Sequence, residues 1–386
     1  MTRRSRVVNN ITLASILLIL WMLSEFMAGW QYHPFRDDWF TLGSPNFWAG
    51  GNRWQFYLDH HLDAYRPLSF LIDIELWSRV WPHEVVVACF LLLSLLATAL
   101  IWRFVLEKIW GYPFWIFVLA LLWWPLTDEG QYWITAATGI VLGLFMLGLG
   151  LTALIYFARK KHSVLAWILA FLAFLAADLC YEQYWFSQFV LVFIIAWRYR
   201  TVFWPVVFSP ASALLLTAGW YERHVPGMVA NGKEANHNLG AGLHSFHAIV
   251  PQIQYIWITE QFSAWREGLR WSHVPAMWLV VVIILSLIFS FFVVSWNYAK
   301  PHEIGEMSVH PLALAGAGLI WIVLSYMPWL FTHYVWVADR SVTVAAIGIG
   351  LLAEALLVIL RPFNVHRIGR MMTMVGLSAF LVTVIV

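Results

Sequence analysis

The chain has 386 residues, of which 61% are hydrophobic and 11% are charged, and its mean hydropathy is +0.72. A soluble domain has roughly 45–50% apolar and about 25% charged residues, so this composition excludes an ordinary soluble protein and predicts an integral membrane protein. The formal net charge of +2 is nearly balanced and no basic run is interleaved with aromatic residues, so nucleic acid is not an expected partner. Cys89 and Cys180 lie in or beside apolar runs, which predicts neither a disulfide framework nor a thiolate metal site.

Apolar runs long enough to cross ~30 Å of hydrocarbon recur along the chain, and we expect one all-α membrane domain over residues 1–386. Hydropathy predicts about eleven transmembrane helices, at Ile11–Trp30, Val85–Leu106, Pro113–Leu126, Tyr132–Phe157, Val164–Leu179, Tyr184–Trp197, Val202–Trp220, Ala276–Trp296, Pro311–Phe331, Val342–Leu360 and Met371–Val386. The third, fifth and sixth are shorter than the usual ~20 residues. They either thin the bilayer locally or stop below the membrane surface and line a cavity.

The distribution of basic residues predicts the orientation. Met1–Arg6 is basic and precedes a long apolar run without a small-residue cleavage site, which favours an uncleaved first helix. One set of loop ends collects the basic residues Arg3, Arg4, Arg6, Arg103, Lys108, Arg159, Lys160, Lys161, Arg198, Arg200, Lys300, Arg361, Arg367 and Arg370. The positive-inside rule makes this side cytoplasmic, with the N-terminus, and we expect the chain in the inner (plasma) membrane with its chemistry on the outer face.

Two long outer loops, residues 31–84 and 221–275, are rich in polar residues. In the first, Pro67–Trp81 is an amphipathic run too polar to span a bilayer, which predicts an interfacial helix. The second opens with Gly, Asn and His residues, which favour turns and mobility. From His244 to Trp271 its apolar residues recur at helical spacing, which predicts a second interfacial helix.

The acid pair Asp37-Asp38 follows the first predicted span, with His33 and Arg36 beside it. Adjacent carboxylates in an extended segment point in different directions, so one can act as a general base while the other is held by a cation or a hydrogen bond. The alternative is a solvated loop pair. The histidines have no zinc-ligand spacing, but Asp38 is a candidate ligand for a divalent cation such as Mg²⁺ or Mn²⁺.

In Tyr65-Arg66-Pro67-Leu68 the proline stands where a helix begins, so Arg66 is expected directly before that helix. A planar cation beside free backbone N–H groups suits a phosphate. The alternative is an arginine that snorkels from an interfacial helix to the membrane surface.

Further polar residues stand at the outer ends of later spans. Asp178 and Glu182 would share one face if their helix continued through both, and Glu129, next to Asp128, ends a short span. Acids at membrane depth cost on the order of 2.5–3.5 kcal/mol each, so they are more often functional or paired than idle, although acidic turn caps in water are the alternative.

His333, Tyr334 and Arg340 follow a span interrupted by Pro328. An Arg and a His arriving together could neutralise a leaving phosphate, whereas a local Asp339–Arg340 ion pair is the plainer alternative. Glu354 is the one acid inside a clear span, and its role stays open.

The basic N-terminus, the first span, the outer loop opening with Asp37-Asp38, the interfacial helices in that loop and the Tyr-Arg-Pro-Leu segment together resemble integral-membrane glycosyltransferases of the GT-C fold. Within that group the pattern is similar to bacterial enzymes that decorate surface polysaccharides and to relatives of the protein O-mannosyltransferases. The similarity is best over roughly the first 180 residues.

The resemblance implies a sugar donor linked to polyprenyl phosphate in the bilayer, and a glycan or other acceptor hydroxyl on the extracytoplasmic side. Asp37 or Asp38 would be the general base. The donor phosphate would be bound by Arg66, Arg340 and His333. The residues that would contact the acceptor or other substrate groups are Tyr65, Glu129, Asp178, Glu182 and Tyr334.

Two other functions remain open. A membrane polysaccharide polymerase or ligase would depend on Arg266, Arg270 and His247 rather than on an acid pair. A lipid-linked sugar transporter or flippase would need acids near the membrane midplane, where the sequence offers mainly Glu354, because its other acids gather at the outer ends.

Overall fold

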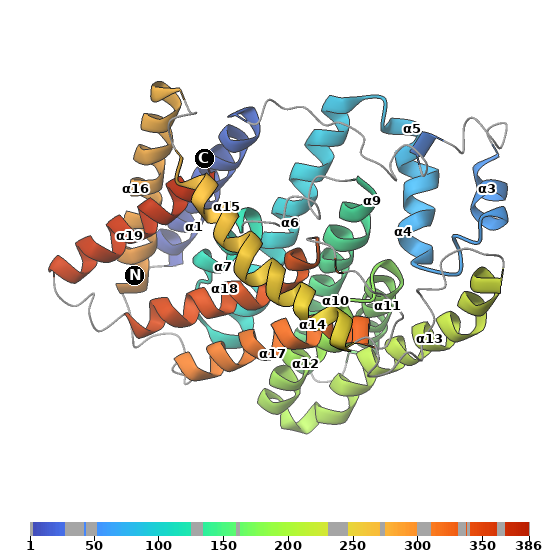
Figure 1. Cartoon of the computed structure of the whole chain (residues 1–386). Helices are drawn as coiled ribbons and strands as arrows, with labels where there is room; N and C mark the ends of the chain where they lie inside the picture. Colours follow the sequence, from blue (N-terminus) through green and yellow to red (C-terminus); the bar gives the residue numbers. More distant parts are fainter. Residues whose placement is uncertain are drawn as a thin grey trace.

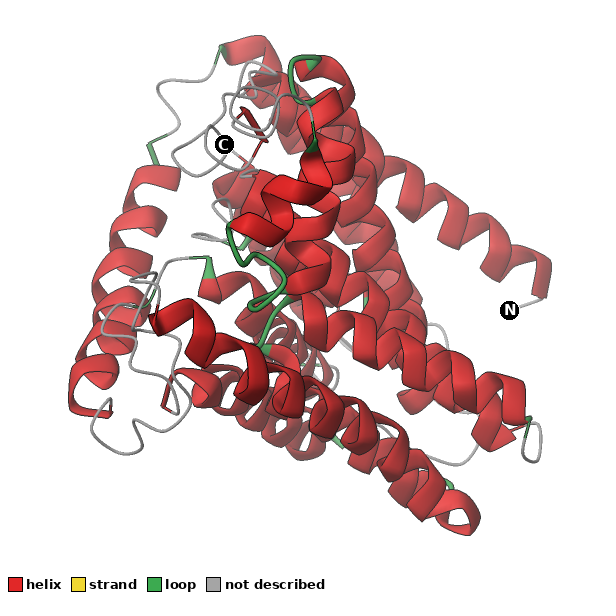
Figure 2. Ribbon diagram, turned by 90° about the vertical axis from the view of Figure 1, so that its right-hand side faces the viewer, coloured by secondary structure: helices red, strands yellow, loops and turns green. Residues whose placement is uncertain are grey.

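A computed structural model of the chain describes residues 3–27, 42–43, 52–124, 134–159, 163–230, 246–270, 275–298, 310–330, 337, 340–360 and 367–385. Within these ranges every regular element is a helix (Figures 1 and 2). The expectation of an all-α protein is therefore confirmed for the described part of the chain.

The helices follow one another along the chain, several joined end to end through short π-helical or 3₁₀ segments labelled η. The first half contains α1 (Arg3–Met27), α3 (Arg53–Asp59), α4 (Pro67–Ile72), η2 (Asp73–Trp77), α5 (Ser78–Val80), α6 (Glu84–Trp110), α7 (Trp115–Trp123), α9 (Ile134–Ala137), η3 (Thr138–Leu142), α10 (Gly143–Arg159) and α11 (Val164–Cys180). The second half contains α12 (Tyr184–Arg198), η4 (Arg200–Val202), α13 (Phe203–Ala230), α14 (Phe246–Gln254), η7 (Tyr255–Glu260), α15 (Gln261–Gly268), α16 (Ala276–Tyr298), α17 (Pro311–Leu330), α18 (Ser341–Ile359) and α19 (Arg367–Ile385).

Each of the eleven predicted spans overlaps a helix of the described residues, but the helices differ in whether they could cross a membrane. Six are long and apolar enough among the described residues: Val85–Trp110, Ile134–Arg159, Arg200–Val225, Ala276–Ser295, Pro311–Trp329 and Ser341–Ile359. These make the chain a multi-pass membrane protein. The nine residues of α7 cover only about 14 Å at the usual rise per residue, less than half of a ~30 Å hydrocarbon layer.

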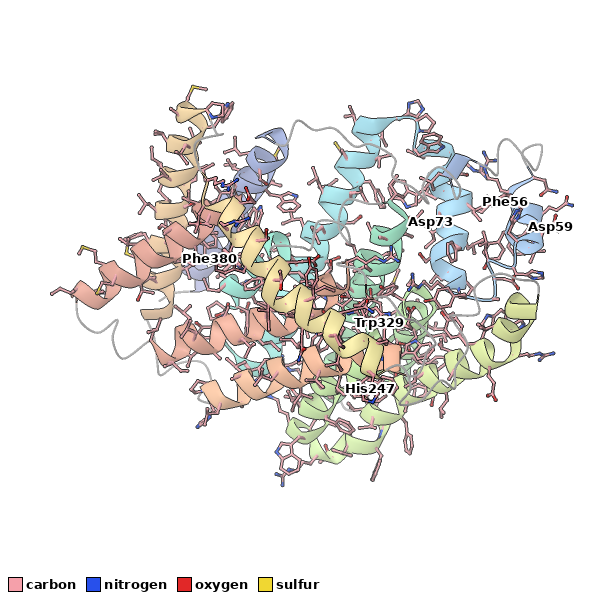
Figure 3. All side chains as sticks on the ribbon, in the orientation of Figure 1. Phe56, Asp59, Asp73, His247, Trp329 and Phe380 are labelled. Carbon is pink, nitrogen blue, oxygen red and sulfur yellow. The ribbon has the colours of Figure 1, made fainter. Side chains whose placement is uncertain are left out.

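The helices predicted in the two polar loops are present. The first runs from Pro67 to Val80 through α4, η2 and α5, and it packs against α11. The second runs from Phe246 to Gly268 across the face of the bundle, from Trp329 on α17 to Phe380 on α19, whose ring centroid lies 5.5 Å from that of Trp265 (Figures 1 and 3).

One predicted boundary is wrong. The sequence places the end of a span at Trp220 and a loop from Tyr221, because polar residues follow, yet α13 continues to Ala230. Tyr221 and Val225 are buried against Tyr65 and Trp185, so tertiary packing keeps this polar stretch helical.

The short helix α7 lies wholly inside the molecule, with all nine of its residues buried. Its first backbone amides therefore need an acceptor that is not water. Glu354 of α18 provides it, because its Oε1 accepts from the backbone N of Phe117 at 3.0 Å. The intramembrane acid left without a role by the sequence thus caps a buried helix.

The backbones of α17 and α18 approach each other closely where Gly318 and Gly348 face each other. A Cβ added to Gly318 would stand 2.6 Å from the backbone oxygen of Gly348, whereas one added to Gly316, two residues earlier in the same helix, would meet nothing within 4 Å. Small residues allow this close approach of membrane helices.

We predict that Gly318→Ala destabilises the protein by about 1–3 kcal/mol, because backbone atoms of α18 must move to admit the methyl group. Gly316→Ala is the matched control, and it should be neutral or slightly stabilising because alanine favours a helix over glycine. Thermal unfolding of both variants in one detergent measures the difference. Equal midpoints for the two variants would contradict the close contact.

Candidate functional site

The site is built around Arg66, whose backbone has left-handed angles of φ 50° and ψ 50° directly before Pro67. A residue before proline is disfavoured in the right-handed helical region, and the left-handed alternative costs on the order of 1–3 kcal/mol outside glycine. Surrounding contacts hold it there, since the backbone N–H of Arg66 donates to the Tyr221 hydroxyl of α13 at 3.0 Å. The prediction that Arg66 directly precedes a helix is confirmed.

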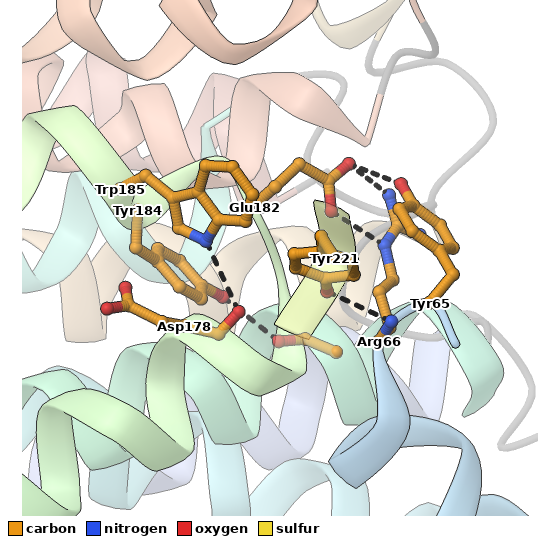
Figure 4. A network of polar contacts seen from close by, with 8 residues as sticks. Tyr65, Arg66, Asp178, Glu182, Tyr184, Trp185 and Tyr221 are labelled. Carbon is orange, nitrogen blue, oxygen red and sulfur yellow. Dashed lines mark hydrogen bonds and ion pairs between the residues drawn. The ribbon is translucent and has the colours of Figure 1, made fainter. Parts of the chain in front are cut away.

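The guanidinium of Arg66 forms a bidentate ion pair with Glu182 (Figure 4). Nε donates to Oε2 at 2.9 Å and Nη2 donates to Oε1 at 2.5 Å. The Tyr65 hydroxyl donates to the same Oε1 at 2.6 Å. Only 16% of the Arg66 side chain and 8% of the Glu182 side chain are exposed, so the pair is fixed in geometry and shielded from salt.

Both partners of this pair stay charged. Burial alone would raise the pKa of Glu182, but the charge of Arg66 and the hydrogen bonds from Arg66 and Tyr65 lower it from the usual 4.5 to about 2. Burial would lower the pKa of Arg66, but the charge of Glu182 outweighs it and raises that pKa above its usual value.

Tyr181 brings a second arginine to the same place. The guanidinium carbon of Arg66 lies 4.1 Å from the Tyr181 ring centroid, and the side chain of Arg340 hydrogen-bonds the Tyr181 hydroxyl. Gln183 reinforces the junction, because its Nε2 donates at 2.8 Å to the backbone oxygen of Ser341, the first residue of α18. Arg66 and Arg340, predicted to converge, are thus joined through one tyrosine.

The turn that carries Tyr181 and Glu182 separates two acids that a continuous helix would place together. α11 ends at Cys180 and Tyr181 is extended, with φ −159° and ψ 128°. The condition for a shared face is not met: Glu182 turns to Arg66, whereas Asp178 accepts from Gln188 at 3.0 Å. In Figure 4 the Asp178 carboxyl group lies at the left, away from the Arg66–Glu182 pair at the right.

Part of the Arg66 guanidinium has no hydrogen-bond partner among the described residues. Of its five N–H groups, Nε and one of Nη2 donate to Glu182, and no acceptor from the described ranges bonds to Nη1. Nη1 lies on the edge of the guanidinium opposite Nε. An oxyanion can bind this second edge.

Several predicted site residues lie outside the described residues, and their placement is not part of this geometry. They are Asp37, Asp38, Glu129, His333 and Tyr334, together with their neighbours Asp128 and Asp339. Within the described ranges no group of three or more His, Cys, Asp or Glu side chains is placed to hold a metal ion. The divalent cation expected at Asp38 stays a prediction.

The sequence did not single out Tyr221 or Gln188 as parts of this network. Tyr221 was hidden because the polar residues after it resemble the start of a loop, and Gln188 because it stands inside an apolar run. A glutamine inside a predicted apolar span is the signal that could have identified Gln188.

Comparisons with protein-family models, with curated proteins and with solved structures find no match to this chain.

We predict that Glu182→Gln destabilises the protein by about 3–5 kcal/mol, because it leaves the buried Arg66 guanidinium without a counter-charge. The matched control is Glu75→Gln, which breaks the exposed pair of Arg79 with Glu75 at 2.7 Å. Such a surface pair contributes about 0–1 kcal/mol. Unfolding of the two variants under the same conditions tests the contrast, and equal losses would contradict the buried character of the Arg66–Glu182 pair.

The same pair predicts a pH dependence. The pKa of Glu182 is lowered from 4.5 to about 2 on folding, so its contribution to stability is fully present above pH 4.5 and is lost as the pH falls towards 2. The difference in unfolding midpoint between the wild type and Glu182→Gln should stay constant from neutral pH down to about pH 4.5 and shrink as the pH falls from there towards 2. If the difference in midpoint already shrinks at neutral pH, Arg66 does not hold Glu182 in its ionised form.

Proposed function

We propose that this protein is a membrane glycosyltransferase of GT-C type, which moves a sugar from a polyprenyl-phosphate donor to an acceptor hydroxyl on the extracytoplasmic face. One observation carries the proposal: Arg66 and Arg340 meet at Tyr181, and Arg66 is held rigidly there by Glu182 and Tyr65. In this proposal the two arginines bind the phosphate of the donor.

The physical argument concerns the leaving group. When the sugar departs, negative charge develops on the lipid phosphate, and fixed cations stabilise that charge without having to reorganise during the reaction. Arginine suits this role because its planar fork matches phosphate oxygens. Among the described residues the cluster has two guanidinium groups and one carboxylate, and this positive balance favours an anionic ligand over a neutral one.

The buried ion pair changes what we propose for some predicted substrate contacts. Tyr65 and Glu182 hold Arg66, so we assign them to positioning that arginine rather than to the acceptor. Asp37 or Asp38 remains our proposal for the general base that accepts the proton of the acceptor hydroxyl. His333 remains a proposed phosphate contact, and Glu129 and Tyr334 remain proposed substrate contacts.

The residues on which a polymerase or ligase would depend have a different environment. Arg266 and Arg270 lie in or just after α15 with more than half of each side chain exposed, and both pair with Glu267. Exposed arginines that share a carboxylate are a weaker phosphate site than Arg66, whose position is fixed from several elements. We therefore place the transferase first.

Binding of polyprenyl phosphate to the purified protein tests the phosphate contacts without knowledge of the sugar. The uncharged polyprenol is the matched ligand. We expect Arg340→Ala to weaken binding of polyprenyl phosphate by 10-fold or more, as for a lost charged hydrogen bond of about 1.5–3 kcal/mol, and to leave polyprenol unchanged. Equal weakening of both ligands, or of neither, would contradict a phosphate contact.

Sugar release from polyprenyl-phosphate donors tests the reaction. We expect Asp37→Asn or Asp38→Asn to lower the rate by ~10²–10⁴, and Arg340→Ala by ~10²–10³, with Glu75→Gln as the control at the wild-type rate. Full activity in both Asp variants would remove the assigned base. Movement of the intact lipid-linked sugar across proteoliposomes, without a covalent product, would instead support a flippase.

A further inference from the structure

A second polar group lies behind the ion pair, and it contains a carboxyl group without a cation. Asp178, in the last turn of α11, and Gln188, on α12, are both completely buried. Gln188 Nε2 donates to Asp178 Oδ1 at 3.0 Å. The other two oxygens of these side chains, Asp178 Oδ2 and Gln188 Oε1, are also buried, and neither has a hydrogen-bond partner among the described residues.

No described residue supplies a positive charge that pairs with Asp178. Within the described ranges its carboxyl group forms no ion pair, and Arg66 is engaged by Glu182. Titratable groups nearby include Asp73 on η2, Cys180 and Tyr181 at the end of α11, Tyr184 on α12 and Tyr221 on α13, and a cation that acts on this cluster, Arg66, is paired with Glu182. Without a cation of its own, an ionised Asp178 carboxylate buried in this place would be strongly unfavourable.

We infer that Asp178 and Gln188 form a buried proton-binding site, in which Asp178 is a neutral carboxylic acid and Oδ2–H donates to Gln188 Oε1. With the observed bond from Gln188 Nε2 to Oδ1, this closes a ring of two hydrogen bonds between an acid and an amide. One proton thus satisfies both unpartnered oxygens and removes the uncompensated charge.

Asp178 and Glu182 are four positions apart but differ in ionisation because their partners differ. Glu182 faces a guanidinium and is ionised, whereas Asp178 faces an amide and is neutral. A neutral Asp178 also adds no negative charge to the described cluster of Arg66, Arg340 and Glu182.

Infrared spectroscopy tests the proton directly. The purified wild type at neutral pH should show the C=O stretching band of a protonated carboxylic acid, and Asp178→Asn should lose it. Gln188→Leu should shift the band to higher frequency, because the acid loses its amide partner. If the wild type and Asp178→Asn give the same spectrum in this region, Asp178 is ionised and the inference fails.

Thermal unfolding provides a second, independent test. Asparagine can form the same two-bond ring with Gln188, so Asp178→Asn should keep the wild-type midpoint, whereas Asp178→Leu should lower it by several degrees because both polar groups of Gln188 lose their partner. A wild-type midpoint that rises saturably with Na⁺, K⁺, Mg²⁺ or Ca²⁺, and no longer does so in Asp178→Asn, would replace the proton by a metal cation.

Discussion

The bidentate contact between Arg66 and Glu182 determines the arrangement around it, because neither charge could remain buried without the other. The contact joins residues that are 116 positions apart. It fixes the chain before α4 against the turn between α11 and α12, and the neighbouring bonds extend the junction to two further helices. Tyr221 attaches α13 to the backbone of Arg66, and Gln183 attaches α18 at Ser341. Four separate parts of the chain are therefore positioned by one charge pair and the hydrogen bonds next to it.

The helix α18 accepts hydrogen bonds from buried donors at two places. Near one end its Ser341 backbone oxygen accepts from Gln183, and towards the other end Glu354 accepts from the first turn of α7. In both contacts a donor lies inside the protein, away from water, and α18 supplies the acceptor that it needs. Most of α18 is buried, which suits a helix that is tied at both ends. Its contact with α17 at Gly318 and Gly348 then sets how closely this pair can approach.

The sequence predicted the helices well because apolar runs report directly on burial and lipid contact, and every predicted span overlaps a helix of the described residues. Pro67 also predicted that Arg66 stands at a helix start. The partner of Arg66 was beyond reach, since a pairing over 116 positions depends on tertiary structure, and Glu182 alone reads equally well as a turn cap. The length of α13 was missed for the same reason: polar residues after Trp220 indicate a loop, but burial of Tyr221 and Val225 keeps them helical. The span count itself stays a prediction, because α7 and the shorter helices do not meet the length of a full crossing.

The charge states of the cluster limit how a ligand could use Arg66. An anion that displaced Glu182 would leave that carboxylate buried and unpaired, at a cost of about 3–5 kcal/mol, which would consume much of what a new arginine contact contributes. The favourable route is binding beside Glu182, at the Nη1 side of Arg66 that no described acceptor occupies, with Arg340 at Tyr181 as the second cation. Glu182 then acts throughout as a fixed support that orients the cation. The positive field needed for an anionic ligand comes from the second arginine, so we expect Arg340, more than Arg66, to decide whether the site discriminates between charged and neutral lipids.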